Sequence, residues 1–128
     1  MNELAKRWLI FAEDDLKMAK LALTAGIYNQ VCFHAQQCAE KALKALSAEQ
    51  GGAPPKTHKL IDLLSSIRNP QIAALRQALQ LLDRFYMTTR YPDTLPGSLP
   101  EGLPIEADAQ SALQTAQRVI EVVRDALQ

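Results

Sequence analysis

The fold of this chain is decided by the stretch YNQVCFHAQQCAEKALK, from Tyr28 to Lys44. Apolar residues recur in it every three or four positions, which is the period of an amphipathic α-helix. The same pattern continues to Leu46, and Gly51-Gly52-Ala53-Pro54-Pro55 ends it, because glycine and proline interrupt helices. The sequence therefore predicts a helix over about residues 27–49.

Helical periodicity extends over most of the remaining chain, and no run alternates with period two. Gly26 is expected to cap the C-terminus of a first helix, and Thr57 and Asn69 to cap the N-termini of two others. Pro92 ends the helix before it, because it disfavours the α region for the preceding residue. Besides residues 27–49, helices are predicted over about residues 3–24, 58–66, 70–90 and 105–127. This pattern predicts an all-α fold: an antiparallel up-and-down bundle of four long helices plus one short helix, with residues 1–128 as a single domain.

Composition narrows the classes of protein. The chain has 128 residues, 48% of them hydrophobic, and its 14 basic and 14 acidic residues cancel. A packed core is expected, whereas disorder and a broad nucleic-acid footprint are not. No apolar run approaches the roughly 18 residues of a membrane span, and the N-terminus has no secretory signal, so we expect a cytoplasmic protein. Cys32 and Cys38 are expected to be buried reduced thiols, and no metal site is predicted.

Two acidic residues and one arginine fall on apolar faces. Asp15 lies within the stripe of the first helix, Asp83 lies beside the stripe of the helix from residue 70, and Arg90 lies further along that face. A carboxylate in such a position needs a partner. We therefore expect Arg90 to pair with Asp15 or Asp83. The pair either only fixes helix register and the following loop, or leaves Arg90 to hold a phosphate or an RNA backbone, with Tyr91 stacking nearby.

The helix over residues 27–49 also has a polar outer side. His34, Gln37 and Lys41 form one row, and Phe33, Gln37 and Lys44 lie on an adjoining row. A Phe among polar groups indicates an interface, so we predict a contact surface at Phe33, Gln37 and Lys44. The alternative is that another helix of the same chain covers Phe33. Lys41 and Lys44 either meet an anion or form a solvated face.

A proline-rich connection runs from Pro92 to Pro104 and includes Asp93. A connection of this length without helical pattern is uncommon and is often functional. It is either a stiff strap over one end of the bundle or a functional lid.

The chain resembles the HEPN domain family, a group of small helical domains named for their occurrence in higher eukaryotes and prokaryotes and for nucleotide binding. The resemblance covers nearly the whole chain. It rests on four motifs: Asp15-Leu16-x-x-Ala19, the stretch from Tyr28 to Lys44, Pro55-Lys56-Thr57-His58-x-Leu60, and Thr89-Arg90-Tyr91-Pro92-Asp93. It implies a helical bundle, commonly a homodimer, and a frequent partnership with a separate minimal nucleotidyltransferase, often as a toxin–antitoxin pair.

Many members of this family are metal-independent ribonucleases whose signature is an Arg followed, after four to six residues, by a His. That signature is absent here, because neither His34 nor His58 has an Arg at this distance upstream. We therefore predict no catalytic residues and no cofactor, and a module that binds a nucleotide, RNA or a nucleotidyltransferase partner. Its predicted ligand contacts are Arg90, Tyr91, Asp93, His34 and Lys41. The alternatives are a ribonuclease toxin that uses Arg90 and nearby residues, and a purely structural homodimer.

Overall fold

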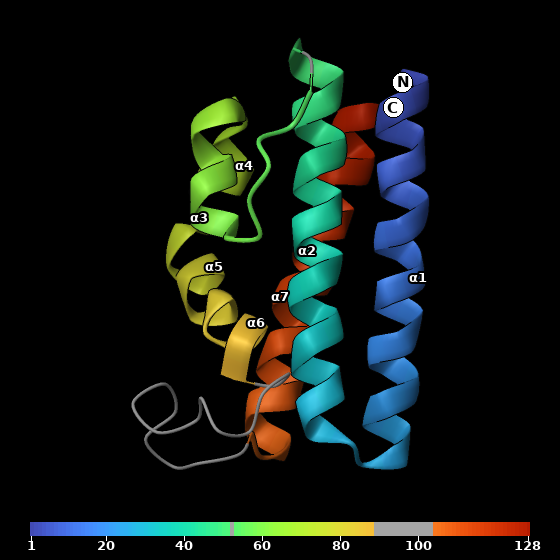
Figure 1. The fold of residues 1–128 in the computed structure, drawn as a ribbon, viewed down its shortest axis with the longest axis vertical. Coiled ribbons are helices and arrows are strands. Elements are labelled where there is room, and N and C mark those ends of the chain that lie inside the picture. The colour runs from blue at the N-terminus through green and yellow to red at the C-terminus, as the bar shows by residue number, and fades with distance from the viewer. Residues whose placement is uncertain (52, 89–103) are drawn as a thin grey trace.

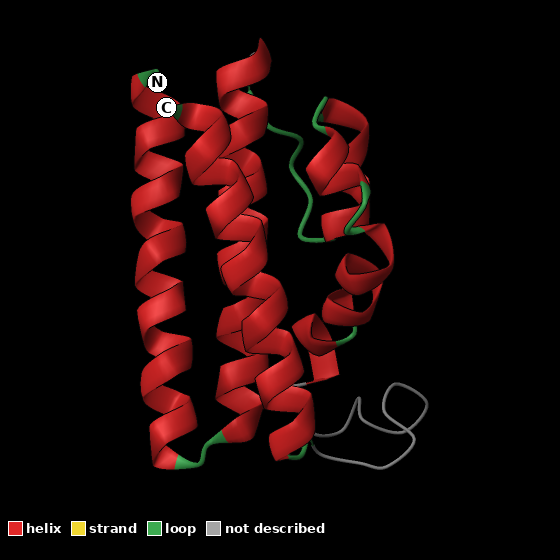
Figure 2. Cartoon of the chain, turned by 180° about the vertical axis from the view of Figure 1, so that it is seen from behind, coloured by secondary structure: helices red, strands yellow, loops and turns green. Residues whose placement is uncertain are grey.

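Three long helices lie side by side in the computed structural model, which describes residues 1–51, 53–88 and 104–128 (Figure 1). These are α1 (Glu3–Ala25), α2 (Tyr28–Gly51) and α7 (Glu106–Leu127). A chain of short helices covers another side of α2: α3 (Leu60–Leu63), the 3-10 turn η1 (Leu64–Ser66), α4 (Pro70–Ala73), α5 (Arg76–Asp83) and α6 (Phe85–Thr88). No strand occurs in these three described ranges (Figure 2). None of their helices combines the length and the apolar content that a membrane crossing requires.

The chain runs up and down, so that both termini lie at one end of the bundle (Figure 1). The predicted all-α bundle is confirmed. The predicted helix from Pro70 to Arg90 differs in detail, because its described part consists of three short helices that pack against α2 and α7. No glycine or proline lies between residues 71 and 91, so the sequence carries no mark of the breaks near Leu75 and Arg84.

The central position of α2 follows from its small residues. Ala35, Ala39, Ala42 and Ala45 are all fully buried, and they leave room for the neighbouring helices to pack closely. Larger core residues fill the remaining space: Leu43, Leu46, Leu60, Leu63, Ile72, Leu79, Leu82, Val119 and Ile120. Fourteen of the 24 residues of α2 are buried, so α2 is the helix around which the others pack.

Two predicted caps are confirmed. Gly26 ends α1 with φ 74°, a left-handed conformation that glycine adopts without a Cβ clash. Asn69 accepts hydrogen bonds at its side chain from the N–H groups of Gln71 and Ile72, with Pro70 at the first helical position.

Cys32 and Cys38 are buried free thiols, as expected, and burial raises the pKa of each to about 12.

Candidate functional site

A polar row of α2 lies inside the molecule. Gln36, Glu40 and Lys44 are 0%, 3% and 7% exposed. They follow one another at four-residue spacing and are covered by α1 and by the segment that leads from α2 to α3. The expectation that Lys44 lies on the outer face is wrong, because sequence periodicity cannot show that a connecting segment covers a polar row.

Asp15 is buried, as expected for a carboxylate in an apolar stripe, and it has two partners on α2. His34 Nδ1 lies 2.9 Å from its Oδ1, and Lys41 Nζ donates a hydrogen bond to its Oδ2. Burial alone would raise the pKa of Asp15, but these two contacts outweigh burial and lower the pKa. The cluster joins α1 to α2. Arg90 lies outside the described residues, and its predicted pairing therefore stays a prediction.

Asp83 links α5 to α3. Its carboxylate accepts hydrogen bonds from the N–H groups of Leu60 at 2.8 Å and Ile61 at 3.3 Å. Gln36 Nε2 donates to the same carboxylate at 3.2 Å. Burial raises the pKa of Asp83, and these hydrogen bonds only partly oppose the rise.

The predicted cap by Thr57 is wrong, because the first turn of α3 is capped from a distant part of the chain by Asp83. The Thr57 hydroxyl instead donates to Asp62 at 2.8 Å and accepts from the N–H group of Lys59 at 3.2 Å.

Glu40 connects Lys44 to His58. Its carboxylate accepts a hydrogen bond from Lys44 Nζ at 3.0 Å and lies 3.2 Å from His58 Nδ1. The His58 ring is stacked on Tyr86 with ring centroids 5.0 Å apart. The backbone carbonyl oxygen of His58 accepts a hydrogen bond from Gln36 Nε2 at 2.8 Å. These contacts attach the segment before α3 to the polar row of α2.

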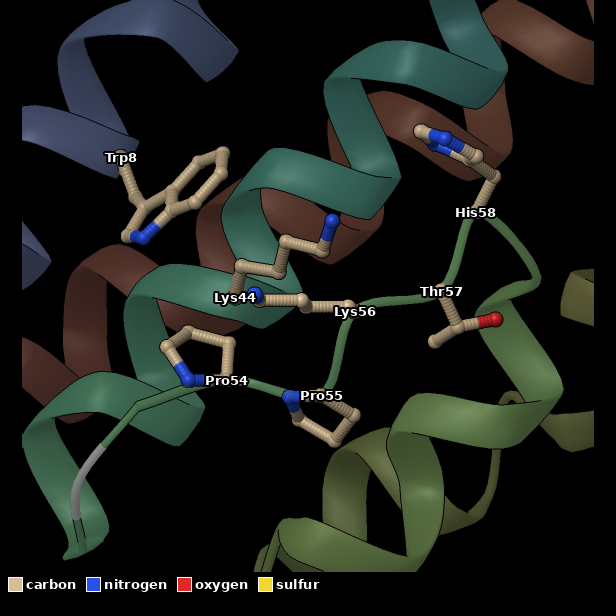
Figure 3. Close-up of a pocket in the computed structure, with 7 residues that line it drawn as sticks. All are labelled: Trp8, Lys44, Pro54, Pro55, Lys56, Thr57 and His58. Atoms are coloured by element: carbon tan, nitrogen blue, oxygen red, sulfur yellow. The ribbon is translucent and has the colours of Figure 1, made fainter.

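A cavity of about 380 Å³ opens beside this row (Figure 3). It is lined by Trp8, Lys44, Pro54, Pro55, Lys56, Thr57 and His58. The Lys44 ammonium lies 5.2 Å from the centre of the Trp8 ring, and the Lys56 side chain extends toward the same space. Trp8 Nε1 is buried and has no hydrogen-bond partner in the part of the chain that the structure describes.

These groups are suited to an oxygen-rich anion. Lys44 and Lys56 supply two positive charges, of which Glu40 balances one. The N–H group of Trp8 has no acceptor among the described residues, and a buried donor without one costs about 1–3 kcal/mol. Trp8 and Lys56 are not among the site residues predicted from the sequence. The available signal was the Pro-Pro-Lys-Thr-His segment, whose prolines restrict the path of the backbone beside α2.

The remaining predicted site residues are distributed as follows. Phe33 is half-buried, and its ring packs against those of His34 and Tyr86 at centroid distances of 5.3 and 6.5 Å. Tyr86 belongs to α6, so the alternative in which another helix of the chain covers Phe33 accounts for part of its burial. Gln37 donates to Gln36 Oε1 at 2.8 Å. The interface role of Phe33 and Gln37 stays a prediction.

Three predicted ligand contacts, Arg90, Tyr91 and Asp93, lie outside the described residues, and so does the connection over residues 92–103. His34 and Lys41 lie together at Asp15 on the α1 side of α2, and they do not line the cavity at Trp8. Within the described ranges, no group of three or more His, Cys, Asp or Glu residues could hold a metal ion.

A helical bundle whose central helix carries a covered polar row, closed by a chain of short helices, defines this protein as a small all-α domain. A family model described as HEPN domain matches residues 5–126, and the chain belongs to this family. Over 134 aligned residues the chain is 28% identical to a Methanocaldococcus jannaschii protein named "Putative toxin MJ1304", with 96% of this chain and 88% of that protein covered.

Solved structures agree with this assignment. TT1696 from Thermus thermophilus has a TM-score of 0.83 and 34% identity, and the match covers 98% of each chain. ST0689, described as an archaeal HEPN homologue, has a TM-score of 0.77 and 32% identity, with 99% of this chain and 100% of that chain covered.

Proposed function

We propose that this chain is a cytoplasmic, dimeric, non-catalytic HEPN module that binds a nucleotide, a partner minimal nucleotidyltransferase, or both, within a toxin–antitoxin pair. Membership of the HEPN family supports the class of module, and the relative named as a toxin supports the toxin–antitoxin setting. The absence of the Arg-x4-6-His signature supports a binding role in place of RNA cleavage.

The cavity at Trp8 carries the nucleotide part of the proposal. Lys44 and Lys56 would bind phosphate oxygens by charge, and the buried Trp8 Nε1 would donate a hydrogen bond to one of them. The lining is otherwise formed by proline rings, the indole and an imidazole, which suit the planar, partly apolar body of a nucleotide. Arg90, Tyr91 and Asp93 stay our further predicted ligand contacts, and Arg90→Ala tests them separately.

Thermal unfolding in the presence of ATP, GTP and inorganic triphosphate tests this proposal. A ligand that binds only the folded protein adds about 2.7 kcal/mol of stability at a hundredfold excess over its dissociation constant, and so raises the melting temperature. We expect Lys56→Ala and Trp8→Phe to reduce that rise. Trp8→Phe keeps an aromatic ring and removes the N–H group. Lys59→Ala removes an exposed lysine that does not line the cavity and serves as the matched control.

The pattern of losses distinguishes the sites. A rise that survives Lys56→Ala and Trp8→Phe but disappears with Arg90→Ala would move the nucleotide from the cavity to the helix end at Arg90. No rise with any nucleotide would contradict nucleotide binding, and co-purification with a minimal nucleotidyltransferase would then become the test of the partner role.

A ribonuclease is the second candidate, and the position of His58 favours it. Its Nδ1 lies against the Glu40 carboxylate, so that Nε2 is left as the nitrogen able to accept a proton, which is the arrangement of an oriented general base. Cleavage of RNA in the presence of EDTA, lost in His58→Asn or Arg90→Ala, would support this candidate. Uncleaved RNA at high protein concentration would exclude it.

A further inference from the structure

Helix α1 carries apolar side chains on the side that faces away from the bundle. Figures 1 and 2 both place α1 at the edge of the molecule, with α2 and α7 on its inner side. Leu4, Phe11 and Met18 are 43%, 55% and 48% exposed and follow one another at seven-residue spacing, which places them in one line along the helix. Ile10 and Leu21, beside that line, are 53% and 66% exposed. An exposed apolar surface of this continuity is typical of a protein–protein interface.

Four charged residues of alternating sign lie beside this line. Glu3, Arg7, Asp14 and Lys17 are all exposed, and none has an ion-pair partner among the residues that the structure describes. Along the helix their charges alternate between negative and positive. The pairs Arg7 with Asp14 and Glu3 with Lys17 share nearly the same midpoint, at residue 10 or between residues 10 and 11.

This order is self-complementary only for antiparallel helices. When two copies of α1 pack antiparallel around a two-fold axis at the shared midpoint, Arg7 faces the partner's Asp14 and Glu3 faces the partner's Lys17. In a parallel arrangement each charge would face its own copy and repel it. A two-fold interface uses the same patch on both subunits, so such self-complementarity is what it requires.

We propose that a second copy of this chain docks on α1, with the two α1 helices antiparallel and the two-fold axis beside Ile10 and Phe11. Phe11 then packs against the partner's Phe11, and Leu4 packs against the partner's Met18. With 23 residues, α1 provides about 35 Å of contact length at 1.5 Å per residue. This inference rests on the dimeric state in the proposed function and specifies which surface forms the dimer.

A hollow at the far end of the line extends the contact surface. It has a volume of about 270 Å³ and is lined by Met18, Leu21, Ala22, Ala25, Ile27, Gln30 and His34. Antiparallel packing brings the N-terminal turn of the partner helix to this end, where the partner's Leu4 can enter the apolar hollow. The surface at Phe33 offers less exposed apolar area, because Phe33 is half-buried against Tyr86.

Sedimentation equilibrium of purified variants tests the face. We expect the parent to be a dimer and Phe11→Asp, which places two carboxylates beside the axis, to raise the dissociation constant at least about a hundredfold. The matched control is Leu81→Asp on α5, because Leu81 has a similar exposure of 53% and lies outside this face. It should leave the dissociation constant within about threefold of the parent value.

A charge exchange tests the register. Arg7→Glu and Asp14→Arg should each weaken the dimer about tenfold, because each places like charges opposite one another. The double variant Arg7→Glu/Asp14→Arg restores both opposite pairs and should return the dissociation constant to within about threefold of the parent value. Phe11, Arg7 and Asp14 are all exposed surface positions, and thermal unfolding of each variant confirms that it folds.

The possible outcomes distinguish the proposed dimeric state from the proposed α1 face. A parent dimer that is unaffected by Phe11→Asp would overturn the α1 face and leave the dimeric state of the proposed function intact. A double variant no stronger than the single ones would overturn the antiparallel register. A monomeric parent at all concentrations would overturn the proposed dimer and this inference together.

Discussion

Removal of the Asp83 carboxylate should destabilise the protein through two backbone groups that are distant in the sequence. Asp83 accepts hydrogen bonds from the N–H groups of Leu60 and Ile61, the first two residues of α3. Leu60 is fully buried, so water cannot replace the lost acceptor at its N–H group. One unsatisfied buried donor costs about 1–3 kcal/mol and one lost helix cap about 1 kcal/mol, so Asp83→Ala should cost about 2–4 kcal/mol.

Urea unfolding followed by far-UV circular dichroism, at one fixed protein concentration, measures this loss. Asp125→Ala removes a carboxylate from an exposed position of α7 and should change stability by less than about 0.5 kcal/mol. Amide hydrogen exchange adds a local measurement, since the N–H groups of Leu60 and Ile61 should exchange faster in Asp83→Ala than in the parent. A loss of stability below about 0.5 kcal/mol, with exchange at these two amides unchanged, would show that Asp83 does not stabilise the first turn of α3.

A comparison of the stability of Asp83→Asn with that of the parent at several pH values tests whether the pKa of Asp83 is raised. Burial raises the pKa of Asp83 above its ordinary value of 3.8, so the folded protein takes up a proton more readily than the unfolded chain. The parent should therefore gain stability relative to the variant as the pH falls through the window above 3.8. The same difference should shrink as the pH rises back through that window, and should stay constant above it, where Asp83 is ionised in both states. An unchanged difference across it would contradict the raised pKa.

Three further predictions concern other parts of the molecule. Asp15→Asn should destabilise the protein at neutral pH by about 1–3 kcal/mol through the contact with Lys41, and because the pKa of Asp15 is lowered, variant and parent should converge in urea unfolding as the pH falls below 3.8. Cys32 and Cys38, whose pKa values are about 12, should react with a thiol reagent at about pH 8 only after denaturant is added, as absorbance at completion would show. Gly26→Ala should lower stability by about 1 kcal/mol in the same unfolding assay, because φ at this position is 74°.

The class of the fold could be predicted from the sequence, because the period of its apolar residues depends only on local geometry. The long helices α1, α2 and α7 begin and end within two residues of their predicted limits. The helix from Pro70 was predicted as continuous and is divided into α4, α5 and α6 in its described part. Its leucines keep the helical period across the breaks, so the breaks cannot be predicted from the period of the apolar residues.

The candidate site was predicted less completely than the fold, because its residues are brought together by the packing of the helices. The sequence identified Asp15 as a carboxylate in need of a partner, since desolvation of a charge requires one. It did not identify His34 and Lys41 as that partner, because helix packing sets which residues of α2 face Asp15. The cavity at Trp8 joins residues of α1, α2 and the following segment, three parts of the chain whose proximity no local pattern encodes.

The sequence by itself determined the three long helices and the glycine and asparagine caps, because short-range sterics and hydrogen bonding set each of these within a few residues. Its motifs indicated the HEPN family. Only the tertiary structure decided which polar face is covered. Lys44 was expected on the outer side of its helix, yet the row of Gln36, Glu40 and Lys44 is buried. The segment from residue 53 to residue 59 covers it and supplies hydrogen bonds that offset the cost of removing these groups from water.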